Sequence, residues 1–383
     1  MTRSMRAAVL VDVDRIEVRD VALSAPEPHE VVVRVEAVGL CGTDLHIVAG
    51  HANYNRDDHG RLRALRDHPQ ILGHEIAGVV AEVGANVDGV RVGDRVVVDQ
   101  GRTCVSELRQ PRCEYCVTGD SHQCEHYREH GIIGLPGGFA EFVTVPSANA
   151  VRITSDLSPE CAALVEPLGC IVHSTHMLTR AAARYALATT ASQRVRSILI
   201  CGGGPAGLLF LQYIRRVMQF DGLVVVSEPN ARKRALAEQF GATTVNPVTA
   251  DVVEAISDLT SGRRVELLIE ASGVGAVFST MPGLIRKQAT VLLYGHGHVG
   301  VELSVMNSVQ FLEPTLVSPA GASGGHDSTG LPRTYQRALS LIEDGTIDVG
   351  SLITHRYQSL DAVPSAFRGD HLHPDYVKGV VLP

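Results

Sequence analysis

The strongest constraint on the fold is a glycine-rich turn between an apolar strand and a helix. Residues 202–207 read Gly-Gly-Gly-Pro-Ala-Gly and fit the pattern G-x-G-x-x-G. The apolar run 197–201 predicts a buried strand before the turn, and helical spacing follows it. Gly202 permits a tight turn, Gly204 lets the backbone approach a pyrophosphate, and Gly207 lets helix and strand pack closely. The turn therefore predicts a dinucleotide site that comprises Gly202, Gly204, Pro205, Ala206 and Gly207.

An acidic residue follows the next predicted strand, which spans 223–227. Glu228 lies about twenty residues after the last glycine, where a carboxylate hydrogen-bonds the ribose hydroxyls of an adenosine. Because a carboxylate also repels a 2′-phosphate, Glu228 favours NAD over NADP. Lys233 follows closely, so a basic pocket that admits NADP is the alternative.

The rest of the chain divides into two patterns. Apolar strands at 265–270 and 290–294 and a helix at 231–240 continue an alternation of strand and helix, which predicts a parallel sheet with right-handed crossovers. In the first 150 residues, the segments 31–38 and 95–98 instead alternate apolar and polar positions, which is typical of half-buried antiparallel strands. We therefore predict an α/β protein with an antiparallel β domain and a doubly wound parallel-sheet domain.

Charge and composition exclude several classes of partner. The 383 residues include 42 acidic and 34 basic side chains, for a net charge of -8, so the chain presents no basic field to a nucleic acid or an anionic membrane. No apolar run reaches the roughly 18 residues of a membrane span, and the N-terminus lacks a signal-peptide pattern. These features predict a soluble, cytoplasmic protein. Its eight cysteines favour a metal site in a reducing compartment over a disulfide scaffold.

Four of the cysteines are closely spaced in a polar segment. Cys113, Cys116 and Cys124 follow the pattern C-x2-C-x7-C, and Cys104 lies upstream. Four thiolates complete a tetrahedral zinc site and leave no position for a substrate, so this cluster predicts a structural zinc. Glu107 is the alternative to Cys104 as a ligand.

A second set of metal-ligating residues is spread over the N-terminal half. Cys41, His74 and Glu166 offer a thiolate, an imidazole and a carboxylate. Three protein ligands leave one position on zinc for water or an alcohol oxygen, and such open coordination indicates a catalytic metal. Each residue taken alone would more simply be a buried structural side chain.

Several motifs then occur in a recognisable order along nearly the whole chain. They are Cys41-Gly42-Thr43-Asp44-x-His46, Gly73-His74-Glu75, Gly93-Asp94-Arg95-Val96, the cysteine cluster, Glu166-Pro167-Leu168 and the turn at 202–207. With them the chain resembles the zinc-dependent medium-chain dehydrogenase/reductase superfamily, which includes alcohol, sorbitol, threonine, butanediol and glucose dehydrogenases. The triplet at 166–168 resembles the polyol and butanediol branch, where a glutamate replaces the third zinc cysteine.

The resemblance implies a particular domain organisation. A GroES-like catalytic domain is expected at residues 1–170, with a structural zinc lobe at about 100–128, and it is completed by residues 313–383. A Rossmann NAD-binding domain is expected at residues 171–312. Zinc and nicotinamide would meet in the interdomain cleft. Family members self-associate through the Rossmann sheet, which implies a homodimer or homotetramer.

The resemblance also implies roles for individual residues. Zinc would lower the pKa of the substrate hydroxyl so that the alkoxide expels hydride toward the nicotinamide ring. Thr43 would pass the hydroxyl proton outward, and His46 would hand it to solvent. Asp44 would orient His74, and Glu75 would approach zinc during ligand exchange.

These inferences converge on one predicted function. The chain is expected to be a zinc-dependent, NAD-linked dehydrogenase that converts a secondary alcohol (a polyol, sugar, cyclitol or vicinal diol) to the ketone or lactone. The alternatives are a metal-free NAD(P)H reductase of the same superfamily and a non-catalytic NAD-sensing protein. Threonine dehydrogenases generally carry a histidine in the loop after the Gly-Asp-Arg-Val motif. Residues 100–102 read Gln-Gly-Arg, which argues against threonine as the substrate.

Overall fold

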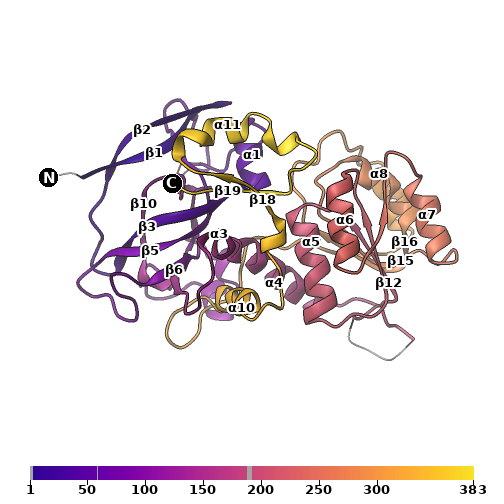
Figure 1. The fold of residues 1–383 in the computed structure, drawn as a ribbon. Helices are drawn as coiled ribbons and strands as arrows, with labels where there is room; N and C mark the ends of the chain where they lie inside the picture. The colour runs from indigo at the N-terminus through magenta and orange to yellow at the C-terminus, as the bar shows by residue number, and fades with distance from the viewer. Residues whose placement is uncertain (1–2, 58, 188–191) are drawn as a thin grey trace. The chain divides into compact units, whose positions relative to one another are not determined.

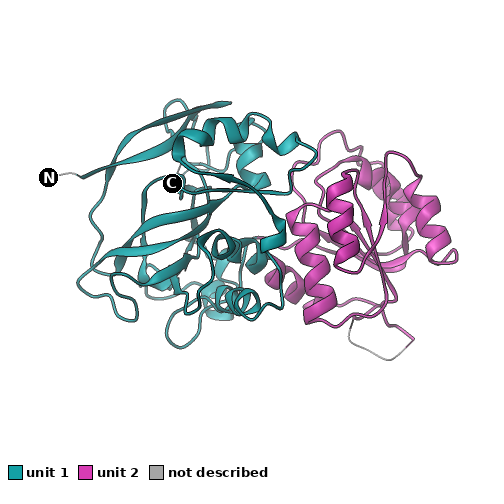
Figure 2. Cartoon of the chain, viewed as in Figure 1, with its two compact units in different colours: residues 1–170, 321–383 teal, residues 171–320 magenta. Residues whose placement is uncertain are grey.

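The computed structural model describes residues 3–57, 59–187 and 192–383. These residues form two compact units, shown in different colours in Figure 2. Unit 1 comprises Met1–Cys170 and Gly321–Pro383, so both ends of the chain contribute to it, and unit 2 comprises Ile171–Ala320. Helix α4 (Val165–Arg180) begins in unit 1 and continues into unit 2.

Unit 1 is built mainly from antiparallel strands. Its strands are β1 (Arg3–Asp12), β2 (Arg15–Leu23), β3 (Glu30–Gly39), β4 (Gln70–Ile71), β5 (Glu75–Val83), β6 (Arg95–Val98), β7 (Gly101–Arg102), β8 (Arg128–His130), β9 (Gly134–Leu135), β10 (Phe142–Pro146), β11 (Ala150–Arg152), β18 (Ile353–Tyr357) and β19 (Lys378–Val381). Its helices are α1 (Gly42–Val48), α2 (Glu114–Thr118), α3 (Pro159–Ala163), α10 (Arg333–Glu343) and α11 (Val363–Phe367). The prediction of antiparallel strands at 31–38 and 95–98 is confirmed by β3 and β6.

The largest sheet of unit 1 joins the two ends of the chain. Its strand order is β11-β6-β5-β3-β19-β18, and β10 also pairs with β3. The C-terminal strand β19 pairs antiparallel with β3, so that Val380 faces Gly39 (Figure 1). This pairing places Lys378, the first residue of β19, beside the end of β3, two residues before Cys41. Valines of β3 and β6 are buried in the core that this sheet covers. Consecutive residues of both strands are buried, so these strands are covered on both faces and not half-buried as the sequence predicts.

Unit 2 is the doubly wound parallel domain that the sequence predicts. Its strands are β12 (Ser197–Cys201), β13 (Leu223–Ser227), β14 (Thr243–Val245), β15 (Val265–Glu270), β16 (Ile285–Leu293) and β17 (Thr315–Val317). Its helices are α5 (Pro205–Gln212), α6 (Ala231–Gln239), α7 (Val252–Leu259), α8 (Ala276–Leu284) and α9 (Val305–Gln310). The six strands are parallel in the order β14-β13-β12-β15-β16-β17. Strand order therefore reverses between β12 and β15, the position at which such sheets bind ligands.

Two details of unit 2 differ from the sequence-based expectation. Strand β16 begins at Ile285 rather than at residue 290. Residues 313–320, which the sequence assigned to the C-terminal part of the catalytic domain, group with unit 2. The physical reason is β17, which pairs with β16 and extends the parallel sheet by one strand. Among the described residues, no helix has the length and apolar character that crossing a bilayer requires.

Candidate active site

Three side chains of unit 1 gather at the ends of β3 and β5. Cys41 precedes α1, while His74 and Glu75 lie at the start of β5. One ligand atom from each lies within 4.8 Å of the other two. His74 and Glu75 are buried and Cys41 is half-buried. A thiolate, an imidazole and a carboxylate are thus brought together from segments that are distant in the sequence.

A buried carboxylate and a buried lysine support these three residues. Asp44 accepts a hydrogen bond from the backbone N–H of Cys41 (3.0 Å), and its Oδ1 lies 3.4 Å from His74 Nδ1. Burial opposes protonation of His74, but the charges of Asp44 and Cys41 outweigh it and raise the pKa of the imidazole. Lys378 Nζ donates to Glu75 Oε1 (2.6 Å) and to the carbonyl of Leu40 (2.8 Å). The donor set is therefore held in place from two sides.

Glu166, the third predicted zinc ligand, does not join the three residues within the 4.8 Å limit. Its Oε1 instead accepts hydrogen bonds from Gln100 Nε2 (2.7 Å) and from the Cys170 thiol (3.2 Å). Burial raises the pKa of Glu166 to about 7. The other amide hydrogen of Gln100 points to Glu129 Oε1 (3.1 Å), and the Tyr335 hydroxyl donates to Gln100 Oε1. This position connects Glu166 to a buried polar network.

Zinc fits the donor set of Cys41, His74 and Glu75. These are residue types that ligate zinc, and buried polar atoms without a partner are rare in folded proteins. Glu75 Oε2 and His74 Nδ1 are both buried and make no hydrogen bond within the described part of the chain. A cation in this position would give the orphaned carboxylate oxygen its partner. The gathering of these donors favours the zinc-dependent hypothesis over the metal-free reductase.

The two residues of the expected proton relay lie on α1. Thr43 and His46 are three residues apart, so they share one face of the helix. Both are half-buried. The ring of His46 lies 6.1 Å from that of His51.

The four clustered cysteines also come together. Cys104, Cys113, Cys116 and Cys124 each place a sulfur within 4.8 Å of the others, and the sulfurs of Cys104 and Cys124 are 3.6 Å apart. Burial opposes ionisation of Cys113, yet hydrogen bonds from the backbone N–H groups of Cys116 and Glu125 lower the pKa of its thiol to about 7. Such an arrangement could hold a tetrahedral zinc ion. Glu107, the alternative ligand, is instead paired with Arg102.

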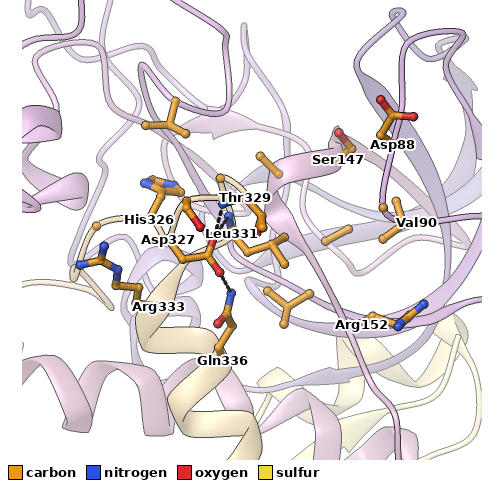
Figure 3. A pocket seen from close by; sticks show the side chains of 18 of the residues that line it. Asp88, Val90, Ser147, Arg152, His326, Asp327, Thr329, Leu331, Arg333 and Gln336 are labelled. Atoms are coloured by element: carbon orange, nitrogen blue, oxygen red, sulfur yellow. Dashed lines mark hydrogen bonds between the residues drawn. The ribbon is translucent and has the colours of Figure 1, made fainter.

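A cavity of about 1240 Å³ lies elsewhere in unit 1. Its wall includes Cys116 of the thiol cluster and the glycine-rich segment 325–331, but none of Cys41, His74 and Glu75. Figure 3 shows Asp327 among the side chains that line the cavity, with hydrogen bonds to Gln336 and Thr329. The cavity is therefore separate from the candidate catalytic residues.

The predicted dinucleotide turn lies at the reversal of strand order in unit 2. Gly202 has a φ of +97°, and a Cβ at Gly207 would lie 1.9 Å from the Gly202 carbonyl oxygen. A Cβ at Gly204 would meet nothing within 4 Å, so this glycine leaves open space before α5. Glu228, after β13, accepts the backbone N–H of Gly203 (2.7 Å) and of Asn230 (2.8 Å). The Asn230 side chain caps α6 by accepting a hydrogen bond from the backbone N–H of Lys233. The open space at Gly204, before the N-terminus of α5, fits a pyrophosphate.

Sequence reasoning missed Lys378 and the network of Gln100, Glu129 and Tyr335. A weak signal existed for Lys378, which is one of only three lysines in a chain that otherwise uses arginine. No local pattern marks the network, because Gln100 and Tyr335 are separated by 235 positions.

Comparison with known proteins identifies the family. Residues 27–155 match the family model described as alcohol dehydrogenase GroES-like domain, and residues 205–344 match the one described as zinc-binding dehydrogenase. The L-threonine 3-dehydrogenase of Pyrococcus furiosus is 32% identical over 352 residues, which cover 92% of this chain and 90% of that protein. The sorbitol dehydrogenase of Bacillus subtilis is 29% identical, over 96% of this chain and 94% of its own.

A solved structure is similar to this chain over its full length. It is a putative zinc-binding dehydrogenase from Sinorhizobium meliloti bound to NADP, with 30% identity, a TM-score of 0.78 and complete coverage of both chains. The chain therefore belongs to the zinc-dependent medium-chain dehydrogenase/reductase superfamily and is an NAD(P)-linked oxidoreductase that acts on CH–OH donors.

Proposed function

We propose that the protein oxidises a secondary alcohol of a polyol, sugar, cyclitol or vicinal diol, with NAD as the hydride acceptor and zinc held by Cys41, His74 and Glu75 or Glu166. The observation that carries this proposal is the donor set within 4.8 Å. When bound, zinc supplies Lewis-acid activation of the alcohol oxygen, and the nicotinamide accepts the hydride. Gln100 donates a hydrogen bond to Glu166, and Lys378 balances the charge of Glu75.

The proton of the alcohol would leave through α1. The Thr43 hydroxyl would accept the substrate proton as it gives its own proton to the His46 imidazole, one turn later on α1, and His46 would release that proton to solvent. Replacing Thr43 with Val should lower kcat by about 10²-fold or more, the usual contribution of a positioned proton-transfer group. Serine at the same position should restore most of the rate.

The loop after the Gly-Asp-Arg-Val motif supports a substrate other than threonine. A Cβ at Gly101 would lie 2.8 Å from His122 Nε2 and 2.8 Å from Tyr127 Cε2. The two rings thus fill the space that a histidine at this position would need. The sorbitol dehydrogenase relative and the glutamate at 166 are consistent with a polyol.

NAD is the proposed cofactor because Glu228 is buried directly after β13 and accepts a hydrogen bond from the glycine-rich turn, where the adenosine ribose would lie. A carboxylate in this position disfavours a 2′-phosphate. The solved relative is bound to NADP, so both nucleotides belong in the test.

A substrate panel tests the proposal. The zinc-loaded protein would be assayed with polyols, sugars, vicinal diols and L-threonine, each with NAD and with NADP, by the absorbance of the reduced nicotinamide. We expect the highest kcat/KM for a polyhydroxylated substrate with NAD. A preference for L-threonine would refute the substrate class. His74→Ala should abolish turnover; full activity in this variant would refute the metal site.

We also propose that the protein is a homodimer or homotetramer in the cytoplasm. In unit 2, Leu303 is 81% exposed and Phe311 is 83% exposed. They flank α9, which precedes β17, the last strand of the parallel sheet. A second copy of the chain would cover this apolar surface and pair with the open strand. Phe311→Glu should yield monomers in light scattering, whereas a monomeric native protein would refute the assembly. None of the eight cysteines forms a disulfide, which suits a reducing compartment.

A further inference from the structure

A buried carboxylate in unit 2 has no part in the mechanism above. Glu270 ends β15 and is fully buried. Its Oε1 accepts hydrogen bonds from the backbone N–H of Ser272 (2.9 Å), the Ser272 hydroxyl (2.5 Å) and the backbone N–H of Gly273 (3.1 Å). Its Oε2 lies 2.7 Å from His298 Nε2. One carboxylate therefore binds two different loops.

These two loops follow neighbouring strands and pack against each other. The first, 271–275, follows β15, and the second, 294–299, follows β16. The backbone carbonyl of Glu270 accepts the N–H groups of Tyr294 (2.9 Å) and Gly295 (2.8 Å). A Cβ at Gly295 would lie 2.4 Å from Glu270 Oε2, and one at Gly273 would lie 2.0 Å from the His296 carbonyl oxygen. Glycine is thus required on both sides of the contact.

The first loop also touches the dinucleotide turn. The backbone N–H of Ala271 donates to the Cys201 carbonyl (2.9 Å), and a Cβ at Gly202 would lie 2.9 Å from Ser272 Cα. Glu228, the adenosine acid, stands on the β13 side of β12. Because a dinucleotide lies across the point of strand reversal, its nicotinamide half must extend to the other side, over the loops that follow β15 and β16.

His298 is held on two sides. Since an ionised carboxylate only accepts hydrogen bonds, Nε2 of His298 carries the hydrogen that points to Glu270. The ring also stands edge-on to Phe278 of α8, with centroids 4.8 Å apart and planes at 88°. The side chain of His298 is 20% exposed, so its outer edge lies at the surface of unit 2.

We propose that His298 is a positioning residue for the nicotinamide half of the cofactor: through Glu270 it holds the loop 294–299 in the conformation that receives the nicotinamide nucleotide. This inference rests on the proposed NAD-linked function. Without the His298 bond, the loop keeps its backbone contacts to Glu270 and Gly273 but loses the side-chain bond that fixes residue 298, and cofactor binding must first order this part of the loop. The adenosine half, on the β13 side, would not depend on this bond.

Two ligands separate these effects. NADH spans both halves of the site, whereas ADP-ribose lacks the nicotinamide. We expect His298→Ala to weaken NADH binding by about tenfold or more, the range for a hydrogen bond to a charged group, and to leave ADP-ribose binding unchanged. His298→Gln, whose amide can still donate to Glu270, should restore most of the NADH affinity. The measurement is calorimetric titration of the zinc-loaded protein. His176→Ala is the matched control, because His176 is an exposed histidine of the same unit.

The outcomes are distinguishable. If His298→Ala binds both ligands as tightly as the native protein, or weakens both equally, the positioning role is refuted. Failure of His298→Gln to recover NADH affinity would also overturn it. If the native protein itself binds neither NADH nor ADP-ribose, the proposed function fails instead.

Discussion

The thiol cluster allows a prediction with a magnitude. In Cys104→Ser one of four sulfurs is removed, and the segment between Cys104 and Cys124, which are 20 positions apart, loses its metal cross-link. Closing a loop of this length contributes about 3 kcal/mol in the chain-entropy description of a cross-link. For a unit of this size, that loss corresponds to a decrease in Tm of roughly 6–12 °C. We expect one zinc per chain instead of two.

Metal content by mass spectrometry and a thermal melt would check this prediction together. Cys161→Ser is the matched control, since Cys161 is a half-buried thiol outside the cluster. It should keep both metals and the native Tm. A Cys104→Ser protein that retains two zinc ions and melts normally would refute Cys104 as a ligand. If Glu107→Gln then lost one zinc, Glu107 would be the fourth ligand.

Three further predictions follow from individual residues. Lys378→Met leaves the buried charge of Glu75 unpaired and should destabilise the metal-free protein by about 3–5 kcal/mol in urea; a loss below about 1 kcal/mol would contradict a buried ion pair. Glu228→Ser should raise the ratio of kcat/KM for NADP over NAD by about tenfold, and an unchanged ratio would contradict its assignment to the ribose. Burial lowers the pKa of His130 from 6.5 to about 4, so the unfolded chain takes up a proton first as the pH falls. The native protein should therefore lose up to about 3 kcal/mol of stability relative to His130→Asn between pH 7 and pH 4; parallel pH profiles would show that His130 titrates normally.

Much of unit 2 and part of the candidate active site can be predicted from the sequence. The strands at 197–201 and 223–227 are apolar except for one serine each, and Gly202 and Gly207 allow the turn that joins strand to helix. Cys113 and Cys116 are close in sequence, and so are Thr43 and His46. Each of these features depends on residues that are close in the sequence. Residue type and spacing are therefore sufficient to predict the strand, the turn or the pair of neighbouring side chains.

The partners of several buried side chains depended on the tertiary structure. Lys378 reaches Glu75 across 303 positions because β19 pairs with β3, and His298 reaches Glu270 because the loops after adjacent parallel strands meet at one edge of the sheet. Glu166 was predicted beside the zinc, yet its partners are Gln100 and Cys170. Residue type and spacing along the chain identified candidate residues for metal and cofactor binding. Which of them share a buried charge or a hydrogen bond was decided by strand order and register, which place distant segments side by side.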